Sequence, residues 1–246
     1  MTVTLAARAK LTWSLRITGL RDDGYHLIDA EMSTLDLHDV LTLDPSRSGI
    51  DVTGPYAAGV PTDDGNLVAS ALRFAGRQAH VTIDKWIPHG GGLGGGSADA
   101  AAVLRWAGVD DVASTAVIGA DVPFCLIGGR ARVRGIGEVV EPLPHVDRVV
   151  SLVIPPLEVS TPHVYRAWDE LGGPTGTTGN DLEPAALHVV PELTEWRDRI
   201  GEACGTRPLL AGSGATWFVE GDHAAVLGPL RELGAAVIVT STVPPG

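Results

Sequence analysis

Six of the seven residues at positions 90–96 are glycine, and regular structure is expected on both sides of them. Residues 79–84 alternate apolar and polar side chains, which predicts a strand. After the run, Ser97 is expected to cap a helix whose apolar residues recur at helical spacing and which ends at Gly108. A glycine loop between a strand and a helix N-terminus presents free backbone N–H groups and the positive end of the helix dipole. We therefore expect this loop to bind an anion, with phosphate as the first candidate.

Two common phosphate-binding loops do not describe this run. The P-loop requires a lysine after its last glycine, but Ser97 and Ala98 follow Gly96. The dinucleotide-binding pattern Gly-x-Gly-x-x-Gly fits from Gly90, but it belongs at the first strand–helix turn of a parallel sheet. Here the run follows three expected strands and a helix. A mobile surface loop is the remaining alternative, and the flanking strand and helix argue against it.

The composition is that of an ordinary globular protein. The chain has 246 residues, of which 44% are hydrophobic and 20% charged. A formal charge of −12 argues against a nucleic-acid surface. The two cysteines, Cys125 and Cys204, and the eight histidines show no metal-ligand spacing, so no zinc site is expected. No apolar run is long enough to span a membrane, and residues 1–10 are too polar for a signal peptide, so we expect a cytoplasmic protein.

Hydrophobic periodicity predicts the elements of the first half. Residues 10–20 alternate as a strand and end in a turn at 21–24; a second extended stretch runs to about 37, and a third strand covers 39–43. Asn66 is expected to cap a helix. Residues 119–124 are expected to form a turn leading into an extended segment, before an alternating stretch at 130–134 and a buried strand at 149–154.

The second half mixes helices and strands. Helices are expected at 161–171, from 180 with a break at Pro191, and at 192–204, and strands at 216–219 and 236–240. Because the elements interleave without a strict strand–helix–strand rhythm, we predict an α+β fold. The expected domain boundary lies near residue 147.

The glycine run and its neighbours resemble the GHMP kinase superfamily. Pro88-x-Gly90-x-Gly92-Leu93-Gly94-x-Gly96-Ser97 is similar to the central signature of that superfamily. Further motifs follow in the same order, among them Asp-Gly-Tyr-His at 23–26, Gly-Ala-Asp-Val-Pro-Phe at 119–124, Asn-Asp-Leu-Glu at 180–183 and Gly-Ser-Gly at 212–214. The chain most resembles the members that phosphorylate 4-diphosphocytidyl-2-C-methyl-D-erythritol.

This resemblance implies a two-domain fold and an ATP site. Residues 1–147 would form a domain like ribosomal protein S5 domain 2, and residues 148–246 a ferredoxin-like α/β sandwich. The residues expected to bind ATP are Pro88, Gly90, Gly91, Gly92, Leu93, Gly94, Gly95, Gly96, Ser97, Ala98, Gly212, Ser213 and Gly214. The hydroxyl of Ser97 is also a candidate contact for Mg²⁺, and no other metal ligand is expected. For the segment at 212–214, a simple hairpin is the alternative.

The same resemblance assigns the catalytic pair. Asp121 is expected to accept the proton of an alcohol, and Lys10 to keep that carboxylate ionised and to neutralise charge on the transferred phosphoryl group. Without the resemblance, Asp121 would be read as a turn residue and Lys10 as a solvated charge at the end of a strand.

The residues expected to bind the acceptor are Thr12, Tyr25, His26, Thr161 and Tyr165. Tyr25 and Tyr165 would stack on the two faces of a cytosine ring, and His26 would bond to its edge. For Tyr165 the alternative is a core residue beside Trp168.

The chain departs from the pattern of its expected relatives in a few places. Thr12 stands where asparagine is common, Ala98 where serine is usual, and Ala211 where serine or threonine is common; the segment 106–119 is also short. These changes lie near the expected nucleotide, whereas Lys10, His26 and Asp121 match the pattern.

We expect an ATP- and Mg²⁺-dependent kinase of the non-mevalonate (MEP) isoprenoid pathway. It would phosphorylate the 2-hydroxyl of 4-diphosphocytidyl-2-C-methyl-D-erythritol by direct transfer. Its expected partner is this small molecule, with no nucleic acid and no membrane, and the expected state is a monomer or homodimer. Two alternatives stay open: another small-molecule GHMP kinase, of the homoserine or mevalonate type, and a nucleotide-binding module without catalysis.

Overall fold

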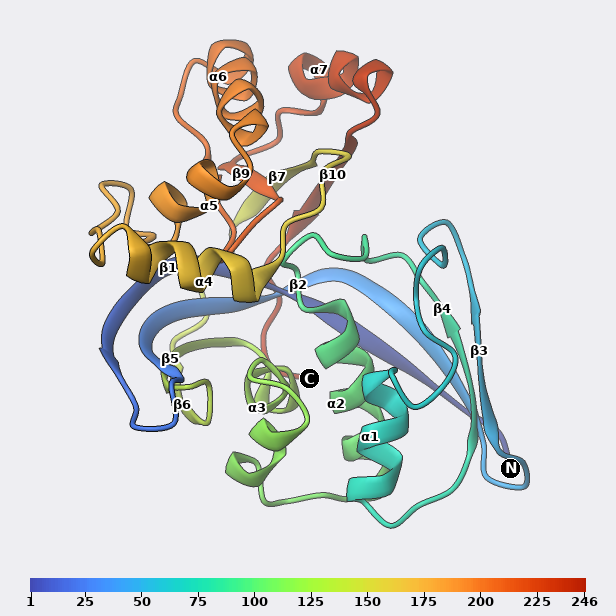
Figure 1. The fold of residues 1–246 in the computed structure, drawn as a ribbon. Coiled ribbons are helices and arrows are strands. Elements are labelled where there is room, and N and C mark those ends of the chain that lie inside the picture. Colours follow the sequence, from blue (N-terminus) through green and yellow to red (C-terminus); the bar gives the residue numbers. More distant parts are fainter.

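Two long paired strands run through the N-terminal half of the molecule (Figure 1). The computed structural model describes residues 1–246. Strands β1 (Val3–Leu20) and β2 (His26–Asp44) form an antiparallel hairpin whose turn contains Gly24 at φ +87°. The predicted strand and turn are therefore confirmed. The predicted break near residue 37 is wrong, because the second and third expected strands are one continuous strand.

The other edge of β2 is shared by two strands. Its C-terminal part pairs with β4 (His80–Asp84), and its N-terminal part pairs with β5 (Arg130–Gly135). Strand β3 (Gly49–Thr53) lies parallel to β4, and β6 (Val139–Leu143) lies antiparallel to β5, which completes a six-stranded sheet. The chain between β4 and β5 holds the glycine loop.

Helices α1 (Leu67–Phe74), α2 (Gly95–Ala107) and α3 (Val122–Ile127), with the short 3-10 helix η1 (Ala113–Val117), pack together beside this sheet (Figure 1). The Asn66 side chain accepts a hydrogen bond from the N–H of Val68 over 2.9 Å, so the predicted cap is confirmed. Helix α2 ends at Gly108, as expected.

Two predictions in this region are wrong. Helix α2 begins at Gly95 after Gly94 in a left-handed conformation (φ +68°), so Ser97 is its third residue and not its cap. The segment expected to be extended after the turn at 119–121 is helix α3. Its Pro123 lies in the first turn, where the missing N–H costs nothing because no intrahelical acceptor exists there.

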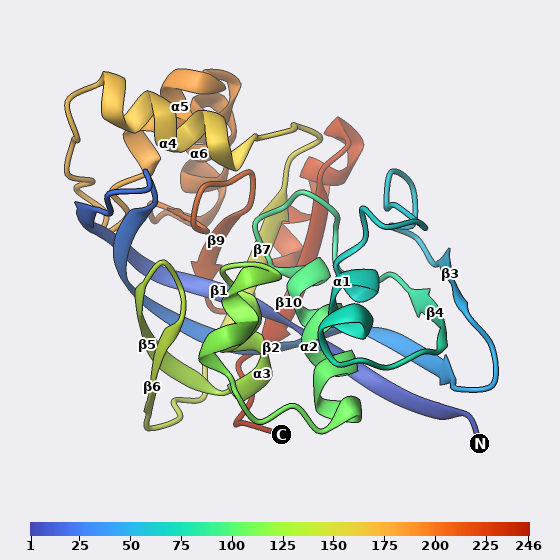
Figure 2. The same ribbon diagram turned by 60° about the horizontal axis from the view of Figure 1, so that its bottom comes forward.

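The C-terminal half contains a four-stranded antiparallel sheet in the order β10-β7-β9-β8. Its strands are β7 (Val149–Ile154), β8 (Leu209–Leu210), β9 (Trp217–Glu220) and β10 (Ala236–Ser241). Its helices are α4 (Thr161–Glu170), α5 (Glu183–Val189), α6 (Glu192–Cys204) and α7 (Ala224–Leu227), with the 3-10 helix η2 (Gly228–Leu233). Figure 2 shows α4, α5 and α6 gathered beside β9 and the turn between β1 and β2. Most of these elements match the predicted ranges, although α5 starts three residues later than expected.

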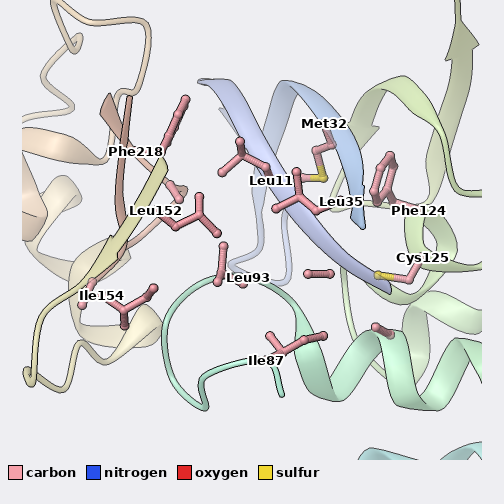
Figure 3. Packing of buried hydrophobic residues seen from close by; sticks show 14 of the residues in the cluster. Leu11, Met32, Leu35, Ile87, Leu93, Phe124, Cys125, Leu152, Ile154 and Phe218 are labelled. Carbon is pink, nitrogen blue, oxygen red and sulfur yellow. The ribbon is translucent and has the colours of Figure 1, made fainter. Parts of the chain in front are cut away.

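The two halves share one apolar core. Figure 3 shows part of it, with Leu152, Ile154 and Phe218 of the C-terminal sheet on one side of Leu93 and Leu11 and Leu35 of the hairpin on the other. The end of the chain also returns to the first half, where the N–H of Val243 donates to the carbonyl of Thr34 over 3.0 Å. Strands β1–β6 precede residue 147 and β7–β10 follow it, and the domain boundary there stays a prediction. None of the helices is both long and apolar enough to cross a membrane.

Candidate active site

The hairpin changes register at Lys10. The pairing of β1 with β2 shifts between Arg8, which faces His38, and Lys10, which faces Thr34. The backbone N–H of Lys10 turns to the glycine loop and donates to the carbonyl of Leu93 over 2.9 Å. This bond joins the loop to the hairpin at the residue predicted to be catalytic.

The ammonium group of Lys10 lies between two polar side chains. Its Nζ is 3.3 Å from Oδ2 of Asp121 and donates to the hydroxyl of Thr12 over 3.2 Å. The Lys10 side chain is 7% exposed, whereas that of Asp121 is 30% exposed. The carboxylate of Asp121 thus faces the ammonium of Lys10 and remains open to a ligand.

The glycine loop approaches neighbouring chain segments too closely for side chains. Gly92 and Gly94 have φ values of +76° and +68°. A Cβ atom on Gly92 would lie 2.8 Å from the carbonyl oxygen of Gly214, and one on Gly94 would lie 2.7 Å from Cγ of Lys10. These positions need glycine for both conformation and space.

The loop ends at a helix N-terminus with free backbone N–H groups. The first helical backbone hydrogen bond of α2 runs from the N–H of Ala98 to the carbonyl of Gly94, over 2.8 Å. The N–H groups of Gly95, Gly96 and Ser97 precede that bond, so they have no helical acceptor. They lie at the positive end of a 13-residue helix. The arrangement suits a phosphate group.

A second glycine turn lies opposite this loop. The side-chain amide of the buried residue Asn180 donates to the carbonyl oxygens of Leu210 (2.9 Å) and Gly212 (2.7 Å). The hydroxyls of Thr161 and Ser213 lie 2.8 Å apart. These contacts hold the turn at 212–214 against the N-terminus of α4.

One cavity of about 540 Å³ joins these groups. The predicted site residues that line it are Lys10, Thr12, Gly90, Gly92, Gly94, Gly95, Gly96, Ser97, Asp121, Thr161, Tyr165, Gly212, Ser213 and Gly214. Pro88, Gly91, Leu93, Ala98, Tyr25 and His26 are predicted site residues that do not line it.

Comparison with known proteins was made against both sequences and structures. Residues 66–129 match the model of the GHMP kinases N terminal domain. The 4-diphosphocytidyl-2-C-methyl-D-erythritol kinase of Paracoccus denitrificans is 39% identical over 87% of this chain and 85% of its own length. The chain belongs to the 4-diphosphocytidyl-2-C-methyl-D-erythritol kinase family.

Solved structures agree with this family. A crystal structure of 4-(cytidine 5'-diphospho)-2C-methyl-D-erythritol kinase superimposes with a TM-score of 0.77 at 33% identity, covering 98% of this chain and all of the other. A homoserine kinase from Cytophaga hutchinsonii shares the fold, with a TM-score of 0.63 at 17% identity over 99% of this chain and 95% of its own. The expected GHMP kinase fold is thereby confirmed.

Part of the predicted acceptor site of this family is assembled. The rings of His26 and Tyr165 have centroids 4.8 Å apart with an interplanar angle of 35°, and Trp168 meets His26 edge-on at 5.6 Å. Burial raises the pKa of Tyr165 above its ordinary value. Tyr165 lines the cavity and also packs against the apolar core, so this position suits both alternatives, and its role toward a cytosine ring stays a prediction. Tyr25 is not part of this group: it is 58% exposed, and its ring lies beside the guanidinium of Arg21.

Two groups of residues in the site escaped the sequence analysis. A carboxylate oxygen of Asp169 lies within hydrogen-bond distance, 2.8 Å, of Nε2 of His26. It lies four residues after Tyr165 on α4, and this spacing places both residues on one face of the helix. The spacing could therefore have predicted Asp169 as a site residue. Lys85 and Asp99 also line the cavity. The ammonium of Lys85 contacts both Asp99 and the buried Asp39. No local pattern links these three.

Proposed function

We propose that the chain transfers the γ-phosphoryl group of ATP to the 2-hydroxyl of 4-diphosphocytidyl-2-C-methyl-D-erythritol. The observation that carries the proposal is the pair of Lys10 and Asp121, 3.3 Å apart in the cavity lined by the glycine loop. A kinase needs a proton acceptor, a cation and a phosphate cradle within one cleft. The family membership supplies the identity of the acceptor.

The transfer is a direct one. Asp121 accepts the proton of the 2-hydroxyl while the oxygen of that hydroxyl forms a bond to the γ-phosphorus. At the same time, the bond between the γ-phosphorus and the β–γ bridging oxygen breaks. Lys10 neutralises part of the negative charge on the transferred group. The N–H groups at the start of α2 hold the remaining phosphates, and ADP leaves with the electron pair of the broken bond.

Mg²⁺ would be held mainly by the phosphates of the nucleotide. The structure has no group of three or more His, Cys, Asp or Glu side chains arranged to bind a metal. Mg²⁺ usually keeps several waters and binds through few protein ligands together with substrate phosphates. Nucleotide phosphates and a single hydroxyl are therefore suitable donors for it. The hydroxyl of Ser97, at the cavity wall, is the protein ligand that we propose. When bound, Mg²⁺ would offset the charge of the phosphates.

The acceptor would extend from Asp121 toward α4. Thr12 lies beside Lys10, and Thr161 and Tyr165 of α4 line the same cavity. His26 stacks against Tyr165, where it can reach a base placed on that ring. In this proposal Tyr25 moves from its exposed position to cover the other face of the base.

A coupled assay for ADP release with this substrate tests the activity. Asp121→Asn should lower kcat by about 100-fold or more, because general-base catalysis typically contributes 10²–10⁴-fold. Asp147→Asn is the matched control, since Asp147 is 98% exposed and does not line the cavity. Full activity of Asp121→Asn would remove the proposed base.

The same assay separates the alternatives. CDP should compete with the acceptor if the chain binds the cytidine group of that acceptor. A homoserine- or mevalonate-type kinase should be insensitive to CDP. A nucleotide-binding module would bind ATP and release no ADP. The cytoplasmic location and the monomeric or homodimeric state remain parts of the proposal, and sedimentation measures the second.

A further inference from the structure

A buried cluster of charges lies beneath the glycine loop. The ammonium of Lys85 contacts the carboxylates of Asp39 and Asp99, and the distance to Oδ2 of Asp99 is 2.8 Å. The side chains of Lys85, Asp39 and Asp99 are 3%, 0% and 2% exposed. Burying charges costs several kcal/mol per ion, and pairing only partly offsets this cost. The cluster therefore calls for an explanation other than net stability.

The cluster connects the two ends of the loop to one strand. Asp39 belongs to β2, and its Oδ1 accepts the N–H groups of Trp86 (2.6 Å) and Ile87 (2.8 Å), immediately before the loop. Asp99 belongs to α2, immediately after the loop. Lys85 joins the two carboxylates. A glycine-rich segment is costly to order, and here both of its ends are held at one point.

The lysine also touches the loop itself. A Cβ atom on Gly95 would lie 3.2 Å from Nζ of Lys85. Lys85 lines the large cavity and also a small one of about 40 Å³ that is otherwise enclosed by the loop and the residues leading into it. The N–H of Gly95 is one of those left free at the helix start. A displaced Lys85 would therefore shift the groups that we assign to the phosphates.

The ammonium of Lys85 keeps its charge in this buried setting. Burial alone would lower the pKa of Lys85, but Asp99 and Asp39 raise it, so the amine stays charged and can hold both carboxylates.

We propose that Lys85, together with Asp39 and Asp99, is a positioning group that holds the glycine loop in its ATP-binding form. The inference rests on the proposed function only in placing ATP at this loop.

The test measures the Kd of a non-hydrolysable ATP analogue, with the KM of the acceptor as a second readout.

Lys85→Met tests the positioning role directly. The Kd of the analogue should rise by about tenfold or more while the acceptor KM changes less than about twofold, since misplacement of binding groups by fractions of an ångström is costly. Glu183→Gln is the matched control, because it removes a carboxylate that is 4% exposed and paired with Arg207, away from the loop. A rise no larger than in that control overturns the proposal. If Lys85→Met does not fold, Asp99→Asn decides: it weakens the link from Lys85 to α2, so the Kd of the analogue should rise several-fold, and an unchanged Kd overturns the proposal. Absence of analogue binding by the wild type would instead refute the proposed function.

Discussion

The hydroxyl of Thr216 donates a hydrogen bond to the carbonyl oxygen of Gly91 over 2.5 Å. Thr216 is fully buried next to β9, so this bond joins the C-terminal sheet to the glycine loop. On the other side, the N–H of Lys10 holds the carbonyl of Leu93. The loop is therefore fixed by both halves of the chain, and its geometry depends on how they pack.

Replacement of Thr216 by valine should loosen the loop. Thr216→Val keeps the shape but leaves the Gly91 carbonyl without its partner, which should cost about 1–3 kcal/mol of unfolding free energy. The KM for ATP should rise several-fold while the acceptor KM stays unchanged. Thr240→Val is the control, because its hydroxyl accepts from the N–H of Leu37, away from the loop. Equal KM changes in both variants would contradict the assignment.

Two glycines of the loop separate backbone strain from crowding. Gly94→Ala and Gly90→Ala both force alanine to a positive φ, at +68° and +75°, which costs about 1–2 kcal/mol each. A Cβ atom on Gly90 meets nothing within 4 Å, whereas one on Gly94 meets the Lys10 side chain. We expect kcat to fall about tenfold further in Gly94→Ala, because a small displacement of a catalytic group is costly. Steady-state kinetics of the two variants with matched thermal melts measure this difference, and equal kcat values would show that Lys10 is not displaced.

Asp169 should affect the acceptor and not the nucleotide. Asp169→Ala frees the ring of His26 to turn. We expect the acceptor KM to rise about three- to tenfold, because the loss of one charge-assisted hydrogen bond at a half-exposed site weakens binding by about this factor. Inhibition by CDP should weaken in parallel. Glu170→Ala on the same helix has no such contact and serves as the control. A shift in the KM for ATP alone would be incompatible with this role.

Asn180 should matter for stability more than the other asparagine of the chain. Asn180→Ala leaves the carbonyls of Leu210 and Gly212 unpaired in the interior, with an expected loss of about 2–4 kcal/mol. Asn66→Ala removes a helix cap, with an expected loss of about 1 kcal/mol. Urea unfolding of both variants measures the difference, and a larger loss in Asn66→Ala would refute this ranking.

The sequence by itself determined the local elements and the family. Period-two alternation identified β1, β4 and β5, and the cap at Asn66 and the stop at Gly108 bounded two helices. These features depend on residues close together in the chain, where backbone and burial rules act directly. Where a local signal was ambiguous, as at Pro123 or around residue 37, packing against the rest of the sheet decided the outcome.

Only the tertiary structure decided how the site is assembled. At a register shift in the hairpin, the N–H of Lys10 bonds to the loop, and the packing of α3 against β1 brings Asp121 to the Lys10 ammonium. The contact of His26 with Asp169 and the cluster around Lys85 likewise join segments distant in the chain. No local pattern encodes such contacts, because they result from register and packing of whole elements. The glycine run thus predicted the phosphate, whereas the fold determined which side chains surround it.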